Sequence, residues 1–93
     1  MSAGLWHLQQ KRDRLKREIG ENLDFLAGSV TTQGPSGGFI LTHKEKAKTK
    51  SRYIRVGMVQ EVRRMTKRNR KLKGLLKELG DVNWEILKLN HPS

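Results

Sequence analysis

The chain has no cysteine, few aromatic residues and no long apolar run, and each of these absences excludes a class of protein. Without cysteine there is no disulfide and no cysteine-ligated zinc site, and nothing favours an oxidising compartment. Aromatic residues make up 5% and hydrophobic residues 34% of the 93 residues, so we expect a thin core. No segment approaches the ~18 consecutive apolar residues of a membrane span, and residues 1–8 do not have the pattern of a signal peptide. The composition predicts one small cytoplasmic domain, residues 1–93.

A pattern for catalysis or metal binding is also absent. The three histidines, His7, His43 and His91, are far apart, and none has a second ligand at i,i+4 spacing. Residues 34–38 lack the Gly-Lys-Ser/Thr of a phosphate-binding loop and are typical of a turn. There is no nucleophile paired with a base and no carboxylate cluster. We therefore expect no enzyme activity, no metal, no cofactor and no small-molecule substrate.

What the chain has in excess is positive charge, and acidic residues are scarce where that charge gathers. Residues 44–77 contain 14 Lys or Arg but only two acids, Glu45 and Glu61, a net charge of +12 in 34 residues. Residues 1–43 sum to +1 and residues 78–93 to −2, so the flanks are nearly neutral. Such a block predicts a polyanionic partner, most commonly DNA or RNA. The candidate nucleic-acid-binding residues are its basic side chains: Lys44, Lys46, Lys48, Lys50, Arg52, Arg55, Arg63, Arg64, Lys67, Arg68, Arg70, Lys71, Lys73 and Lys77.

Apolar spacing predicts two long helices. Residues 4–27 follow steps of three and four from Leu5 to Leu26, with leucine or isoleucine at every position of the stripe except Arg12 and Asn22, which is typical of an amphipathic helix with a narrow apolar stripe. Residues 58–90 carry a coiled-coil-like seam. Its members alternate steps of three and four: Val62, Met65, Asn69, Leu72, Leu76, Leu79, Asn83 and Ile86. Gly80 can break this helix, but the seam passes it without slipping, so one continuous helix is favoured.

Between the helices, residues 29–56 have the composition of a small β-meander. Strands are expected at residues 38–43 and 51–56, joined by a long basic hairpin loop at 44–50, and residues 29–33 can add a third strand. The predicted fold class is α+β, with two long antiparallel helices joined by a small two- or three-stranded antiparallel sheet.

The cations of the second helix fall mainly on the face turned away from its seam. Arg64, Arg68 and Lys73 flank the seam. Five others point away from it: Arg63, Lys67, Arg70, Lys71 and Lys77. A helix face that is only exposed to solvent usually has glutamates between its cations, because Glu–Lys pairs at i,i+4 stabilise exposed helices. Residues 63–77 contain no acid, which favours a functional polyanion-binding face.

The cations of the hairpin region alternate along the sequence. In an extended chain they would project from one edge and follow a phosphate backbone. These residues are Lys44, Lys46, Lys48, Lys50 and Arg52. The same pattern fits a flexible solvated loop, or an edge strand that lysine protects from aggregation. For Tyr53 there are also two interpretations: its ring stacks on a base, or it packs in the core or against a neighbouring strand. The sequence leaves both the role of these cations and the role of Tyr53 open.

The unequal helix lengths predict a homo-oligomer. At ~1.5 Å per residue the second helix is longer by about ten residues, so in an antiparallel hairpin its C-terminal part has no intrachain partner. Ile86, Leu87 and Leu89 lie in this overhang, and a second subunit would bury them. The same hairpin predicts that Trp6 and Trp84 are buried neighbours at one pole.

The order of these features resembles a family of small uncharacterised proteins from bacterial and archaeal genomes. The resemblance spans residues 20–89 and is carried by Gly28-Ser29, Gly34-Pro35, Phe39-Ile40-Leu41-Thr42, residues 48–54 and Asn83-Trp84-Glu85-Ile86-Leu87. It implies a helix, a hairpin and a long final helix in a protein carried by mobile genetic elements. The family's hairpin is cysteine-rich, and this chain lacks those cysteines, so any metal site there is not carried over.

These observations together predict a non-enzymatic nucleic-acid-binding protein that contacts phosphates, with duplex DNA favoured over RNA. Phosphate contacts position a protein without reading sequence, and the second helix matches no known groove-binding motif, so base specificity is not predicted. The alternative is a structural, self-associating protein whose basic face binds an acidic protein or a membrane surface. A membrane is disfavoured because the second helix has no aromatic residue before Trp84.

Overall fold

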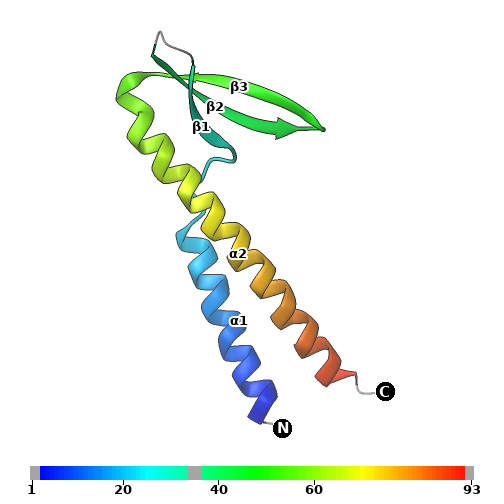
Figure 1. The fold of residues 1–93 in the computed structure, drawn as a ribbon. Helices are drawn as coiled ribbons and strands as arrows, with labels where there is room; N and C mark the ends of the chain where they lie inside the picture. The colour runs from blue at the N-terminus through cyan, green and yellow to red at the C-terminus, as the bar shows by residue number, and fades with distance from the viewer. Residues whose placement is uncertain (1–2, 34–36, 92–93) are drawn as a thin grey trace. The chain divides into compact units, whose positions relative to one another are not determined.

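The computed structural model describes residues 3–33 and 37–91 (Figure 1). Its elements follow in the order α1 (Ala3–Glu21), β1 (Ser29–Gln33), β2 (Gly38–Glu45), β3 (Lys48–Ile54), a 3-10 turn η1 (Val56–Met58) and α2 (Val59–Asn90). The predicted α+β class with two helices and a small antiparallel sheet is confirmed, and the sheet has three strands. The chain divides into two compact units, a helical unit of Met1–Leu23 with Lys71–Ser93 and a sheet unit of Asp24–Arg70.

In the helical unit, α1 runs antiparallel to the C-terminal half of α2, and the first turn of α1 lies beside the last turns of α2 (Figure 1). The apolar side chains of α1 lie on one face of the helix, at steps of three, seven and four residues, and meet those of α2. Leu15 is fully buried in this contact. The cluster is completed by Leu75, Val82 and Ile86, with Leu5, Leu8, Ile19 and Leu79 packed against it. At the surface, Lys11 Nζ and Glu78 Oε1 are 3.3 Å apart.

α1 ends at Glu21, six residues before the predicted end at 27, and Asn22 provides the reason. The Asn22 backbone N–H donates to the Ile19 carbonyl at 3.0 Å, and its side-chain Nδ2 donates to the Glu18 carbonyl at 2.7 Å. An amide side chain that occupies the i−4 carbonyl competes with the helical backbone bond. The helix therefore stops at this residue, although the apolar spacing continues beyond it.

α2 is one continuous helix, as predicted, but its buried stripe does not keep the predicted heptad. Leu76 and Asn83 are exposed, and Leu75 and Val82 are buried in their place. The buried positions step by three rather than four residues from Leu72 to Leu75. A strict heptad persists only where partner helices follow each other along a coiled coil. Here strands pack on the first part of α2 and α1 packs on the second, so no single helix partner maintains the repeat.

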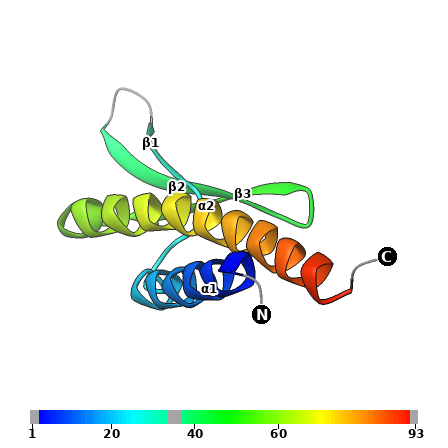
Figure 2. The same cartoon turned by 90° about the horizontal axis from the view of Figure 1, so that it is seen from below.

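The sheet unit holds a three-stranded antiparallel sheet in the order β1-β2-β3, which lies along one side of the N-terminal part of α2 (Figure 2). Every second strand position contributes a side chain to its apolar face, because strand side chains alternate between faces. These side chains pack on the first turns of α2 and form a second core. Its members are Leu26, Val30, Phe39, Leu41, Ile54, Val59 and Val62.

The segment before β1 is fixed to the rest of the sheet unit by its backbone. The Leu26 N–H donates to the Met65 carbonyl of α2 at 3.2 Å. Gly28 follows with φ of +130°, and a Cβ at this position would lie 2.4 Å from the Thr42 carbonyl oxygen. Only glycine fits this close approach without moving the strand.

The predicted basic loop at 44–50 is wrong. β2 continues to Glu45 and β3 begins at Lys48, so the hairpin turns on two residues only, Lys46 and Ala47. Both have positive φ, 51° and 67°, as in a type I′ turn, whose twist matches that of the flanking strands. The ladder therefore continues through charged residues, with Glu45 opposite Lys48. β3 also ends two residues earlier than predicted, where the 3-10 turn follows.

Candidate nucleic-acid interface

Most of the positive charge belongs to the sheet unit. Residues 24–70 contain eleven Lys or Arg and three acids, a net charge of +8, whereas the helical unit carries +3. Of the predicted binding cations, Lys71, Lys73 and Lys77 fall in the helical unit, where all three are exposed. The other eleven belong to the sheet unit, so a site can be built there from the residues of one compact body.

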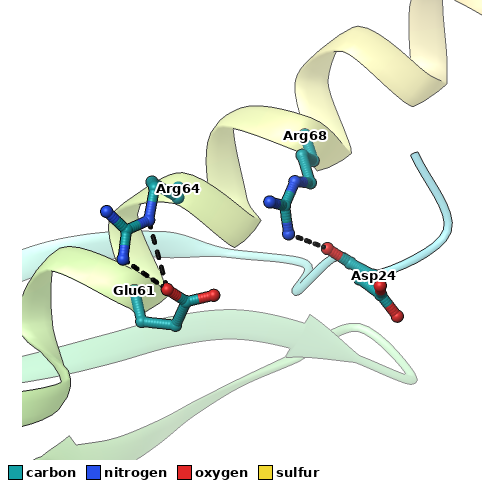
Figure 3. Close-up of polar contacts among 4 residues, drawn as sticks. All are labelled: Asp24, Glu61, Arg64 and Arg68. Atoms are coloured by element: carbon teal, nitrogen blue, oxygen red, sulfur yellow. Dashed lines mark hydrogen bonds and ion pairs between the residues drawn. The ribbon is translucent and has the colours of Figure 1, made fainter. Parts of the chain in front are cut away.

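Two of the predicted cations on α2 are held by acceptors of the protein itself (Figure 3). The Arg64 Nε donates to the Glu61 carboxylate at 3.1 Å, and the Arg68 Nη1 donates to the Asp24 carbonyl at 3.0 Å. The hydrogen bond from Arg64, followed by the charge of its guanidinium, lowers the pKa of Glu61. These contacts use some of the five N–H donors of each guanidinium, so fewer donors of Arg64 and Arg68 are left for a phosphate.

Three other cations of α2 meet at one place. Arg63, Lys67 and Arg70 line a shallow depression of about 260 Å³, and the start of β1 contributes Ser29 and Val30 to it. Their i,i+4,i+7 spacing places the three cations on one face of the helix. None of the described residues that line this depression is acidic. We call it the cationic depression.

Neighbouring contacts fix part of the cationic depression. The Arg63 guanidinium lies over the ring of Phe39, with 5.7 Å between its carbon and the ring centroid. Thr66 is buried, and its hydroxyl donates to the Arg63 carbonyl at 3.0 Å. Lys67 and Arg70 are exposed, and neither has an ion-pair partner within the described part of the chain. Guanidinium and ammonium groups in this arrangement can bind phosphate oxygens, and a guanidinium can do so through two donors at once.

The hairpin cations do not project from one edge, which corrects the prediction. The two-residue turn pairs Glu45 with Lys48, so odd positions of β2 share a sheet face with even positions of β3. Lys48, Lys50 and Arg52 therefore lie on the face that carries the core, and Lys44 lies on the opposite face. Lys50 Nζ is 3.3 Å from the Glu45 carboxylate. All four cations are exposed, but they form two groups.

Tyr53 lies opposite Ile40 on the sheet face turned away from the core, and it is 73% exposed. A core position for this ring is therefore wrong, whereas cross-strand pairing with Ile40 agrees with the register. Stacking on a base stays a prediction. Arg55 is exposed in extended backbone immediately before the 3-10 turn.

The predicted oligomer interface is only partly at the surface. Ile86 is buried among the residues that pack against α1, because α1 pairs with the C-terminal half of α2 and leaves no overhang there. Leu87 and Leu89 are exposed. The predicted burial of two tryptophans is also wrong, since Trp6 is 52% and Trp84 is 61% exposed. Both rings lie outside the stripe through which the two helices meet.

A second basic surface, on α1, was not predicted. It is a depression of about 470 Å³ formed by residues of that helix alone. The residues that line it are His7, Gln10, Lys11, Asp13, Arg14 and Arg17. The steps of three and four between its basic residues are a signal present in the sequence. The near-neutral sum of residues 1–43 conceals this signal, because Asp13 in the depression and three acids outside it cancel most of the charge.

No helix in the described part of the chain is long and apolar enough to cross a membrane. Residues 3–33 and 37–91 also contain no group of three His, Asp or Glu side chains placed to hold a metal ion. Comparison with protein-family models, curated proteins and solved structures finds no match to this chain.

Proposed function

We propose that the protein binds nucleic acid without catalysis, chiefly through phosphates, and prefers duplex DNA to RNA. The observation that carries this proposal is the cationic depression, where Arg63, Lys67 and Arg70 converge and no described lining residue neutralises them. The net charge of +8 on the sheet unit supports it, because so concentrated a field attracts a polyanion and repels a second basic protein. The fold then serves as a rigid support for a charged surface.

The spacing of the cations matches a nucleic-acid backbone. The seven-residue step from Arg63 to Arg70 spans ~10 Å of helix, and duplex DNA presents one charge per ~1.7 Å of its axis. The three side chains can therefore reach neighbouring phosphates at the same time. With the exposed cations of the hairpin, the sheet unit would neutralise about 5–8 phosphates.

The helical unit favours a second, compatible role in self-association. Trp84, Leu87, Lys88 and His91 line an open depression of about 400 Å³, and Leu89 is exposed nearby on the same helix. A homodimer that covers these apolar side chains would leave the sheet units to bind DNA in the cytoplasm. The alternative function uses the same surfaces differently, in a structural oligomer of a mobile element that binds an acidic protein or a membrane surface.

The test is an electrophoretic mobility shift with duplex DNA, single-stranded DNA and duplex RNA of equal length. We expect the tightest binding to duplex DNA, with a log–log salt slope of about −4 to −7. Lys67→Glu with Arg70→Glu should weaken binding to every sequence and flatten the slope, and the fold should survive because both residues are exposed.

The matched control is Lys16→Glu with Arg17→Glu, which removes the same charge from two exposed positions of the helical unit. It should reduce binding much less. Equal losses in the two variants would show that only net charge matters and that the cationic depression is not the site. If no nucleic acid binds in a salt-dependent way, the proposal is wrong, and anionic vesicles and an acidic protein are the next partners to test.

A further inference from the structure

One face of the sheet is open, although its other face holds a core. The strand register places a defined set of side chains on this open face: Ser29, Thr31, Ile40, Thr42, Lys44, Thr49, Ser51 and Tyr53. Six of the eight are exposed, and Ile40 and Thr42 are half-buried. The three acids of the sheet unit do not belong to this set, because Glu45 alternates onto the core face and the other two lie outside the strands. The open face is thus uncharged or positive along its whole length.

The side chains of the open face are suited to form hydrogen bonds with the polar edges of DNA bases. Five of its side chains are serine or threonine, each with a hydroxyl that can donate or accept a hydrogen bond. The Thr42 hydroxyl already donates to the Ser29 carbonyl at 3.3 Å, which holds it in one orientation. Lys44 adds a cationic donor, and Tyr53 adds an exposed ring beside Ile40. Hydroxyls, a lysine and threonine methyl groups are all used for contacts with base edges.

The shape of the sheet fits one groove in particular. β1 pairs with β2 only as far as Thr42, so the hairpin continues past β1 as a two-stranded ribbon. In the ribbon His43, Lys44 and Glu45 lie opposite Lys50, Thr49 and Lys48. Two strands lie ~4.8 Å apart, and the ~12 Å major groove of B-form DNA admits a two-stranded ribbon. The deep, narrow major groove of A-form RNA does not admit one.

We propose that the β2–β3 ribbon enters the major groove of B-form duplex DNA with its open face toward the bases, while the exposed lysines of its edge strand contact the phosphates. This inference rests on the proposed function and extends it from phosphate binding to base readout. Lys48 and Lys50 belong to the edge strand β3 and are exposed, so they can reach the groove walls. The ribbon carries one acid, Glu45, which is already paired with Lys50.

Competition on the unmodified protein tests this assignment. Methyl green occupies the major groove and netropsin the minor groove, so each is titrated into the protein–duplex complex at fixed salt. We expect methyl green to displace the protein and netropsin to leave it bound. Displacement by netropsin alone, or salt-dependent binding that neither compound disturbs, would overturn groove readout and leave phosphate binding standing. A complete lack of DNA binding would instead overturn the proposed function and this inference with it.

Substitution on the open face gives an independent readout. Thr49→Ala removes one hydroxyl from an exposed position on the open face of the ribbon, and should lower affinity for duplex DNA about fivefold with an unchanged salt slope. The matched control is Thr32→Ala, at an exposed β1 position on the other sheet face, and it should bind as the unmodified protein does. Circular dichroism checks that the sheet is retained in both. Equal affinities of the two variants would contradict the proposal.

Discussion

The guanidinium of Arg63 lies over the ring of Phe39, 5.7 Å from its centroid, so one contact joins the core of the sheet unit to the cationic depression. Phe39 packs against buried residues on one side, and its ring supports the cation on the other. A cation over an aromatic face contributes about 0.5–1 kcal/mol at a site exposed to solvent. The same contact also limits the positions that the guanidinium can take before a phosphate arrives.

This contact predicts an energetic coupling between the two side chains. A double-mutant cycle of Arg63→Met and Phe39→Leu, followed by urea unfolding, should give a coupling free energy of about 0.5–1 kcal/mol. Phe39→Leu alone should also weaken DNA binding a few-fold, because Arg63 loses its support. Strictly additive free energies of unfolding would show that the stacking contributes nothing.

Glu61 predicts a way to strengthen DNA binding. Its carboxylate accepts a hydrogen bond from Arg64, so Glu61→Gln should release that guanidinium for phosphate. We expect tighter binding at low salt and a salt slope steeper by up to about one contact. Glu78→Gln, which removes the acid that pairs with Lys11 in the helical unit, is the matched control and should not change the slope. A slope unchanged in both variants would place Arg64 outside the binding surface.

The pKa of Glu61 fixes the pH range in which this pair acts. Because Arg64 lowers the pKa in the folded state, the unfolded chain takes up the proton first as the pH falls. The stability from the pair is therefore present above the ordinary carboxyl pKa of ~4.3 and is lost as the pH falls through the lowered value. Urea midpoints of the unmodified protein and Glu61→Gln should differ at neutral pH and converge in acid. A constant difference down to pH 2 would contradict this linkage.

Gly28 and Gly80 predict opposite responses to alanine. Gly28 has φ of +130°, and a Cβ at this position would lie 2.4 Å from the Thr42 carbonyl oxygen. Gly28→Ala should therefore lower the free energy of unfolding by about 1–3 kcal/mol. A Cβ at Gly80, inside α2, would meet nothing within 4 Å, so Gly80→Ala should raise it by up to ~1 kcal/mol. Thermal unfolding measures both. Destabilisation by Gly80→Ala would mean that another surface covers this part of α2.

The fold class was predictable because helical spacing and alternating strand residues appear wherever one face is buried. The structure of the hairpin tip was not predictable, because both faces of its strands carry charged or polar residues. The alternation of apolar and polar residues that marks a half-buried strand is therefore missing there. Its turn also lacks the usual marker, because Lys46 and Ala47 adopt positive φ where glycine or asparagine is typical. One misplaced turn was enough to assign Lys44 to the same sheet face as Lys48.

The candidate site was predicted as a set of cations but not as a geometry. The pairing of Arg64 with Glu61 was predictable from the sequence, because side chains at i and i+3 of a helix lie next to each other. The engagement of Arg68 was not, because it depends on where the segment before β1 carries the Asp24 carbonyl. The same is true of Ser29, which reaches the cationic depression only through the path of that segment. Chain paths of this kind depend on tertiary packing, and local sequence patterns do not contain them.

The positions of Ile86 and Leu87 on adjacent residues of α2 separate folding from self-association. Ile86 is buried in the core of the helical unit, so Ile86→Asp should destabilise the fold by several kcal/mol, about 3 or more, at any protein concentration. Leu87 and Leu89 are exposed, so Leu87→Asp with Leu89→Asp should leave the circular dichroism spectrum unchanged. If these leucines form the dimer interface, the double variant sediments as a monomer at concentrations where the unmodified protein is a dimer. Dilution should then lower the melting temperature of the unmodified protein but not that of the double variant. An unmodified protein that is monomeric at high micromolar concentration, with a melting temperature independent of dilution, would show that the exposed leucines serve no self-association.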